Sequence, residues 1–341
     1  MNLKLFSKYR RELMGIACLW IIAYHNFCDW PRALRPLKWF VNRGNAGVDV
    51  FLILSGIGLY YSFSGSKEEK GKVRQFYKRR FVRLLIPYIL FALPYYMWAA
   101  NGHGINRFLM DFFQISLPLK GMVTTWYITA SAVFYLLFPL IYVILEKQWT
   151  FKGKPIERNT VTVILCVLAA LMCRIILRFW PVFFKNCEIA LTRLVPFLAG
   201  CGLGKAVKEG REISKTMVFS SFVFVFVYVC IFMREIILPT FWARMSFTPF
   251  ALSVLVVFSW IFEQFELAKL RSMFRFFGDR SLELYLTHVM IKRVWLTCLK
   301  DVTIDPWSFT PYLCVVILSV IISTLTHPLI QTISSRILTT K

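Results

Sequence analysis

The sequence predicts an all-α, polytopic membrane protein, a bundle of about ten transmembrane helices that forms a single domain over residues 1–341. Hydrophobic residues make up 57% of the chain and aromatic residues 17%. The mean hydropathy of +0.59 is high for a soluble domain. Apolar runs long enough to cross a bilayer recur along the whole chain, at 13–29, 46–63, 81–100, 124–145, 160–180, 189–207, 215–232, 246–264, 281–298 and 311–333.

The order and ends of these runs indicate retained membrane spans. The first run is not a cleaved signal peptide, because it ends in Cys28-Asp29-Trp30-Pro31 without a small-residue cleavage pattern. Trp, Tyr and Phe at many of the other ends are typical interfacial anchors. The second run carries Asp49, the third follows a basic segment, the fourth begins near Trp126, the sixth contains Arg193 and the ninth contains His288. No loop is long enough to fold alone, so we expect one integral membrane domain.

The net charge of +23 follows the topology of these spans. With the amino terminus inside, most Lys and Arg residues fall in loops of one side, as the positive-inside rule requires. We therefore expect both termini in the cytoplasm and the basic loops against anionic membrane lipid. This placement argues against a nucleic-acid partner. Most of the nine cysteines lie inside predicted spans without a Cys-x-x-Cys pair, so we expect neither a disulfide framework nor a metal site.

Two ionisable residues interrupt consecutive apolar runs, His25 late in the first and Asp49 early in the second. A carboxylate inside a membrane costs at least about 2.5 kcal/mol, so such residues are typical of functional sites. The two spans run in opposite directions, and both side chains should lie at similar depth in the outer half of the membrane. They permit a His25–Asp49 dyad in which the acid orients the imidazole as a general base. The alternative is a polar pair that only holds two helices together.

Basic residues gather where the first and third spans meet the cytoplasm. Arg11 lies about four helical turns before His25, on the same helix face. Arg79, Arg80 and Arg83 share a face at the entrance of the third span. Such a cluster suits a phosphate-bearing ligand, because guanidinium groups form bidentate hydrogen bonds with phosphate. The alternative is positive charge that serves only to set the topology.

The ninth run carries a narrow polar stripe of Ser281, His288 and Lys292, which should line a cavity and not face lipid. Glu283 points elsewhere, and we expect it to pair with a basic residue of a neighbouring span. Arg193 is a buried cation that requires a partner.

Other charged residues allow less specific interpretations. The outer-loop cations suit either an anionic acceptor or lipid headgroups; they are Arg32, Arg35, Lys38 and Arg43. For His103, in an outer loop, and His327, before Pro328 in the last span, we expect incidental placement.

Five motifs occur in order along the chain. They are Gly47-Val-Asp-Val-Phe-Leu-Ile-Leu-Ser-Gly56, Arg79-Arg80-Phe-Val-Arg83-Leu-Leu-Ile-Pro87, Trp126-Tyr127 followed by Phe134-Tyr135-Leu-Leu-Phe-Pro139, Arg193-Leu-Val-Pro196-Phe197-Leu-Ala-Gly200, and Gly278-Asp279-Arg280-Ser281-Leu282-Glu283-Leu284-Tyr285-Leu286-Thr287-His288. Together they resemble the acyltransferase-3 family of bacterial integral membrane O-acyltransferases, of the glycan O-acetyltransferase type. With the basic residues before the first span, the resemblance covers residues 11–288.

The resemblance implies a donor and an acceptor. The donor is an acyl-CoA, commonly acetyl-CoA, that enters from the cytoplasm. The acceptor is a hydroxyl of a cell-surface or lipid-linked glycan. It implies further that His25 is the catalytic residue, that Asp49 is the signature aspartate, and that Arg80 and Arg83 are the arginines that follow the second span.

The chain departs from the family pattern at two places. Many members have an arginine where this chain has Met14, and Arg11 stands one turn earlier. Many members also have glutamates where this chain has Ser131 and Ala132. The first departure leaves open whether Arg11 replaces the missing arginine.

We hypothesise that coenzyme A phosphates bind Arg80 and Arg83, together with Arg11 or Arg79, and that the thioester lies near His25. His25, oriented by Asp49, deprotonates the acceptor hydroxyl, or else it carries the acyl group as an intermediate. Candidate substrate or oxyanion contacts are Trp126, His288, Arg193 and Ser281.

Two other functions compete with this hypothesis. A multi-span transporter or flippase of glycan lipids also requires buried charges, although we find no internal repeat of the kind that transporters often show. A degenerate relative could serve as a scaffold or sensor. For the enzyme we expect the bacterial cytoplasmic membrane as its location.

Overall fold

The computed structural model describes residues 1–25, 33, 35–65, 71–122, 124–233, 240–298 and 309–339. Helices dominate these residues, as predicted, and the regular strands among them form one short hairpin of β1 (Thr150–Phe151) and β2 (Lys154–Pro155). The all-α fold class is confirmed.

The helices follow one another with short connections. In chain order they are α1 (Leu5–Lys8), α2 (Arg10–Tyr24), α3 (Arg35–Val41), the 3-10 turn η2 (Gly44–Ala46), α4 (Gly47–Ser64), α5 (Lys72–Ala99), α6 (Ile105–Phe112), α7 (Ser116–Lys120), α8 (Trp126–Glu146), α9 (Arg158–Phe179), α10 (Pro181–Leu191), α11 (Leu194–Glu209), α12 (Lys215–Met233), α13 (Thr240–Gln264), α14 (Ala268–Asp279), α15 (Ser281–Cys298) and α16 (Phe309–Thr339).

Seven helical stretches in the described ranges are long and apolar enough to cross a membrane. They are Gly44–Ser64, Lys72–Ala99, Trp126–Glu146, Arg158–Phe179, Pro181–Glu209, Phe241–Gln264 and Pro311–Thr339. The chain is therefore a multi-pass membrane protein.

The other three predicted spans are also helical but shorter or more polar. α2 has 15 residues, and the end of the predicted run 13–29 lies outside the described residues. The apolar part of α12 covers only Lys215–Ile231. α15 carries Glu283, Lys292 and Arg293.

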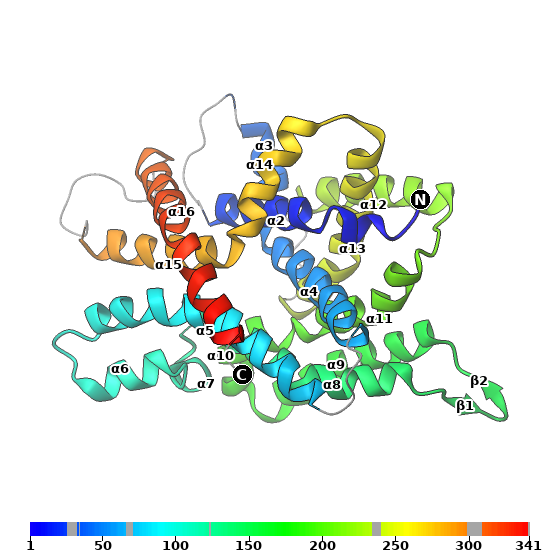
Figure 1. Ribbon diagram of the computed structural model, residues 1–341, viewed down its shortest axis with the longest axis horizontal. Coiled ribbons are helices and arrows are strands. Elements are labelled where there is room, and N and C mark those ends of the chain that lie inside the picture. Colours follow the sequence, from blue (N-terminus) through cyan, green and yellow to red (C-terminus); the bar gives the residue numbers. More distant parts are fainter. Residues whose placement is uncertain are drawn as a thin grey trace.

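Helices α2 and α4 lie at the centre of the molecule. Figure 1 shows α5, α15 and α16 on one side of them and α12 and α13 on the other. α6 and α7 lie at one end of the long axis, and the β1–β2 hairpin lies at the other. Much of the core therefore consists of the faces that surround α2 and α4.

Small residues allow the central helices to approach closely. A Cβ at Gly56 of α4 would overlap the backbone of Phe197 and Gly200 in α11, and a Cβ at Gly200 would overlap the backbone of Ile53. Close backbone approach is the usual way in which membrane helices pack. Gly15 of α2 likewise contacts the backbone of α14 at Phe274. These contacts hold α4 against α11 and α2 against α14.

Charged residues hold the amino-terminal segment in place. Lys8 and Tyr9 both donate hydrogen bonds to Glu263, each at 2.6 Å, and the bond to Glu263 raises the pKa of Lys8. Glu12, which the sequence analysis did not single out, is buried and accepts a hydrogen bond from Arg275 at 2.7 Å. The start of α2 is thus anchored to α13 and α14.

Candidate functional site

A cavity of about 410 Å³ follows one face of α2. Arg10, Met14, Cys18 and Ile22 line it at intervals of four residues, which is the spacing of one helix face, and His25 lines it beyond the end of α2. Arg10 and His25 are about 22 Å apart along the helix axis. The other walls come from α4, α5, α8, α10, α13 and α15. Its volume is within the range of small-molecule sites.

The cavity wall combines apolar and polar side chains. Met14, Phe51, Leu84 and Leu282 form part of its apolar surface. The walls also carry polar groups of α8 and α15, and these are Trp126, Tyr127, Tyr135, Ser281, Tyr285 and His288. The predicted polar stripe of α15 therefore does line a cavity through Ser281 and His288.

His25 pairs with His288 at one end of the cavity. The Nδ1 atom of His25 lies 2.9 Å from Nε2 of His288, and the two rings stack with centroids 5.1 Å apart. Nδ1 of His288 lies 2.7 Å from the carbonyl oxygen of Leu284. Lys292 donates a hydrogen bond to the carbonyl oxygen of His25 at 2.5 Å. Two residues of α15, His288 and Lys292, thus hold His25 just beyond the end of α2.

These contacts define the tautomers of the two neutral imidazoles. A carbonyl oxygen only accepts, so Nδ1 of His288 carries a hydrogen and its Nε2 carries a lone pair. Nδ1 of His25 must then donate to that lone pair. Nε2 of His25 is left without a hydrogen, which is the state that a general base requires.

The predicted His25–Asp49 hydrogen bond is wrong. Asp49 is completely buried and forms an ion pair with Arg193, whose guanidinium also donates to Asn45 Oδ1 at 2.7 Å. A buried carboxylate needs a full positive charge nearby, which a neutral imidazole does not supply. Asp49 therefore holds α4 against Arg193, the residue that precedes α11. The expectation that Arg193 has a buried partner is confirmed, and neither Asp49 nor Arg193 lines the cavity.

Arg10 lines the other end of the cavity, and three further arginines lie near it. Arg10, Arg79, Arg80 and Arg83 lie close enough to interact electrostatically, and Tyr135 of the cavity wall acts on Arg10 and Arg80. The Nε atoms of Arg79 and Arg80 are buried without a hydrogen-bond partner. No acidic side chain in the described part of the chain forms an ion pair with these arginines. The cluster is an excess of positive charge with unused donors.

Arg11 is not part of this cluster. It forms an ion pair with Asp279 of α14, and its side chain is 57% exposed. Arg10 lines the cavity instead, one turn before Met14. The sequence analysis favours Arg11 because it lies about four helical turns before His25, on the same face of an ideal helix.

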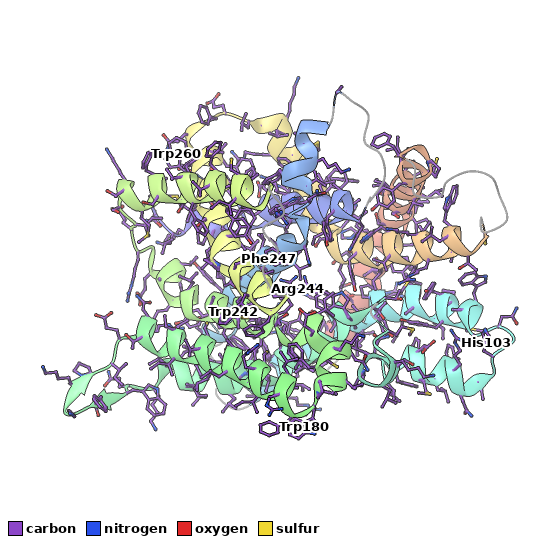
Figure 2. All side chains as sticks on the ribbon, turned by 180° about the vertical axis from the view of Figure 1, so that it is seen from behind. His103, Trp180, Trp242, Arg244, Phe247 and Trp260 are labelled. Atoms are coloured by element: carbon purple, nitrogen blue, oxygen red, sulfur yellow. The ribbon has the colours of Figure 1, made fainter. Side chains whose placement is uncertain are left out.

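The structure also shows the surroundings of Glu283 and of the two other histidines, His103 and His327. Nδ1 of His327 lies 2.9 Å from Glu283, which confirms a partner for Glu283 and corrects the incidental placement expected for His327. His103 lies at the edge of the molecule, far from Arg244 (Figure 2). Sequence reasoning missed Arg244, which lines the cavity and pairs with Glu188 at 3.1 Å.

Of the outer-loop cations, Arg32 lies outside the described residues. The side chain of Arg35, at the start of α3, is likewise not described. Arg43 precedes η2 and interacts with Tyr24 of the cavity wall. The described residues contain no group of His, Cys, Asp and Glu side chains that could hold a metal ion.

The fold and the cavity define a multi-pass membrane protein with a buried histidine pair at one end of a cavity and an arginine cluster at the other. A family model described as an acyltransferase domain, that of the acyltransferase-3 family, matches residues 13–327, so the chain belongs to this family. Membership makes it a membrane acyltransferase. The chain has no match among curated proteins or among solved structures.

Proposed function

We propose that the protein transfers an acyl group, most simply acetyl, from cytoplasmic acyl-CoA to a hydroxyl of a cell-surface or lipid-linked glycan. The observation that carries this proposal is the single cavity that contacts both Arg10 and His25. A donor that binds by its phosphates at one end can present its thioester at the other. We further propose that the Arg10 end faces the cytoplasm of a bacterial cell, with both termini on that side.

The arginine cluster supports acyl-CoA as the donor. Coenzyme A carries several phosphates, and Arg10, Arg80 and Arg83 offer charge and free donors for them. Arg10 takes the place of the arginine that other members have at the position of Met14, because both residues lie on the cavity face of α2. The pantetheine arm would lie along the apolar part of the cavity wall, past Cys18.

The histidine pair supports the chemistry. Nε2 of His25 accepts the proton of the acceptor hydroxyl, and the oxygen attacks the thioester carbon. The C–S bond then breaks, and the imidazolium returns the proton to the departing thiolate. His288 keeps Nδ1 of His25 engaged throughout. Trp126 and Ser281 line the cavity and carry donors for the developing oxyanion. An acyl-His25 intermediate is consistent with the same contacts.

The test uses purified protein in nanodiscs with radiolabelled acetyl-CoA and a crude membrane glycolipid fraction as acceptor. His25→Ala should lower label transfer by about 10²- to 10⁴-fold, the usual contribution of a general base. Acetyl-CoA binding should persist, because the arginine cluster is unchanged. His103→Ala, which alters an exposed histidine, is the matched control and should transfer at the wild-type rate.

Equal transfer rates in wild type and His25→Ala would remove His25 from the mechanism. If the wild-type protein neither binds nor consumes acetyl-CoA, the proposal fails and transport of glycan lipids becomes the better hypothesis.

A further inference from the structure

Gly58 of α4 differs from the glycines through which the central helices pack. A Cβ at Gly56 would lie 2.6 to 2.8 Å from backbone atoms of α11. A Cβ at Gly58 would instead meet the side chain of Arg10, at 3.1 Å from Nη2 and 3.2 Å from both Cζ and Nε. The space beside Gly58 is therefore occupied by a guanidinium group of α2.

The missing side chain of Gly58 also exposes a backbone acceptor. Nε of Arg10 donates a hydrogen bond to the carbonyl oxygen of Leu54 at 3.3 Å. Leu54 precedes Gly58 by four residues in α4, so this carbonyl is the one that accepts from the N–H of Gly58 in a regular helix. Helical side chains lean toward the amino terminus, so a side chain at residue 58 would lie over the carbonyl of residue 54. Because glycine has none, the carbonyl can accept a second hydrogen bond from Arg10.

These contacts engage one part of the Arg10 guanidinium and leave another for a ligand. Within the described part of the chain, Arg10 forms one hydrogen bond, the one from Nε to Leu54. Arg10 lines the cavity, together with Tyr127 and Tyr135 of α8. A guanidinium with both Nη groups unused can donate two parallel hydrogen bonds to a phosphate. Holding the side chain in place beforehand lowers the entropy that is lost on binding.

We infer that Gly58 is a positioning residue of the donor site, which lets Arg10 lie against α4 with its Nη groups free to bind a phosphate of acyl-CoA. The identity of the ligand rests on the proposed function. The contact between Gly58 and Arg10 is a feature of the fold and can be tested with a simpler phosphate ligand.

The experiment measures binding of acetyl-CoA and of inorganic pyrophosphate by calorimetry, with the protein in nanodiscs. In Gly58→Ala the new methyl group should displace the guanidinium by a few tenths of an ångström and cover the Leu54 carbonyl. Both ligands should bind about five- to tenfold more weakly, as expected for a weakened hydrogen bond to a charged group. In the transfer assay the KM for acetyl-CoA should rise by the same factor, while kcat stays unchanged because His25 is not affected.

Two further variants separate positioning from packing. In an Arg10→Ala background, Gly58→Ala has no guanidinium to displace and should leave the remaining affinity unchanged, so the two substitutions should be non-additive. Gly65→Ala, at the end of the same helix, is the matched control, since a Cβ there would contact the carbonyl oxygen of Tyr61 at 3.3 Å and not Arg10. The unfolding midpoint of Gly58→Ala should not fall, because alanine is the better helix former.

Two results would overturn the inference. One is a Gly58→Ala variant that binds both ligands as Gly65→Ala does, and the other is an equal loss of affinity with and without Arg10, which a packing defect would cause. A wild type that binds pyrophosphate but not acetyl-CoA refutes the proposed donor, and the effect of Gly58→Ala on pyrophosphate then decides the inference. A wild type that binds neither ligand refutes both.

Discussion

Three of the four ring nitrogens of His25 and His288 are engaged in hydrogen bonds, and only Nε2 of His25 is left for a substrate. The carbonyl oxygen of Leu284 determines this arrangement, because it accepts and cannot donate. Through His288, the carbonyl oxygen of Leu284 thus determines which ring nitrogen of His25 carries the hydrogen. His288 is by this argument a positioning residue.

His288→Gln should retain part of the function of His288, since its side-chain oxygen can accept from Nδ1 of His25. His288→Phe removes that acceptor and should lower the transfer rate by roughly fivefold or more, the equivalent of one net hydrogen bond of about 1 kcal/mol. Acetyl-CoA binding should stay unchanged in both. The measurement is label transfer as a function of pH. Equal rates and equal pH profiles in the two variants and the wild type would rule out the positioning role.

At the scale of single elements, α2 and the residue that follows it carry both the proposed anion site, at Arg10, and the proposed base, His25. Its cavity face begins with Arg10, and Cys18 lies between that arginine and His25. α14 holds it from outside through the Glu12–Arg275 and Arg11–Asp279 pairs. In the proposed mechanism, the length of α2 would therefore set the distance between the donor's phosphates and its thioester.

This arrangement predicts a separation of function along α2. Cys18→Phe should fill the middle of the cavity and abolish acyl transfer, while adenosine 3′,5′-bisphosphate, the nucleotide part of coenzyme A, still binds the arginine cluster. Arg80→Gln should weaken the binding of both acetyl-CoA and adenosine 3′,5′-bisphosphate. Cys18→Ser is the control of similar size and should remain active. Binding is measured by calorimetry and transfer with radiolabel. Loss of nucleotide binding in Cys18→Phe would show that the phosphates do not bind where we propose.

The lengths of the apolar runs predict the long helices, but not the shorter helices α3, α6, α7 and α14, and not how the helices pair. The contact between His25 and His288 joins residues 263 positions apart, and no local pattern indicates that α15 and not α4 supplies the partner of His25. The cost of a charge in an apolar span makes Asp49 a candidate functional residue and predicts a partner for Arg193, yet their mutual ion pair depends on how α4 packs on α11. The sequence does not show which of Arg10 and Arg11 lines the cavity, because the ion pair between Arg11 and Asp279 depends on how α14 packs.

At the scale of the whole molecule, the loops on the two membrane faces differ in charge. The β1–β2 hairpin contains Lys152 and Lys154, whereas the connection between α5 and α6 contains His103. Both connections are exposed. If the positive-inside rule holds, the hairpin is cytoplasmic and the α5–α6 connection is external.

The orientation can be tested by labelling intact cells with a membrane-impermeant maleimide. In a background without native cysteines, His103→Cys should be labelled and Lys152→Cys should be labelled only after the cells are opened. The two positions serve as controls for each other, since both are exposed. The reverse pattern would place the arginine cluster outside and would exclude cytoplasmic acyl-CoA as its ligand.

The apolar part of the cavity wall has an energetic consequence for the cell. In the proposed orientation the cavity extends from a cytoplasmic cluster toward an external histidine, across the layer that insulates the membrane potential. A continuous chain of water there would conduct protons and dissipate the stored gradient. Met14, Phe51, Leu84 and Leu282 offer water few hydrogen-bond partners, and apolar walls of this kind oppose a continuous chain of water. In that orientation, the same side chains would let the base and the donor site serve opposite compartments without a proton leak between them.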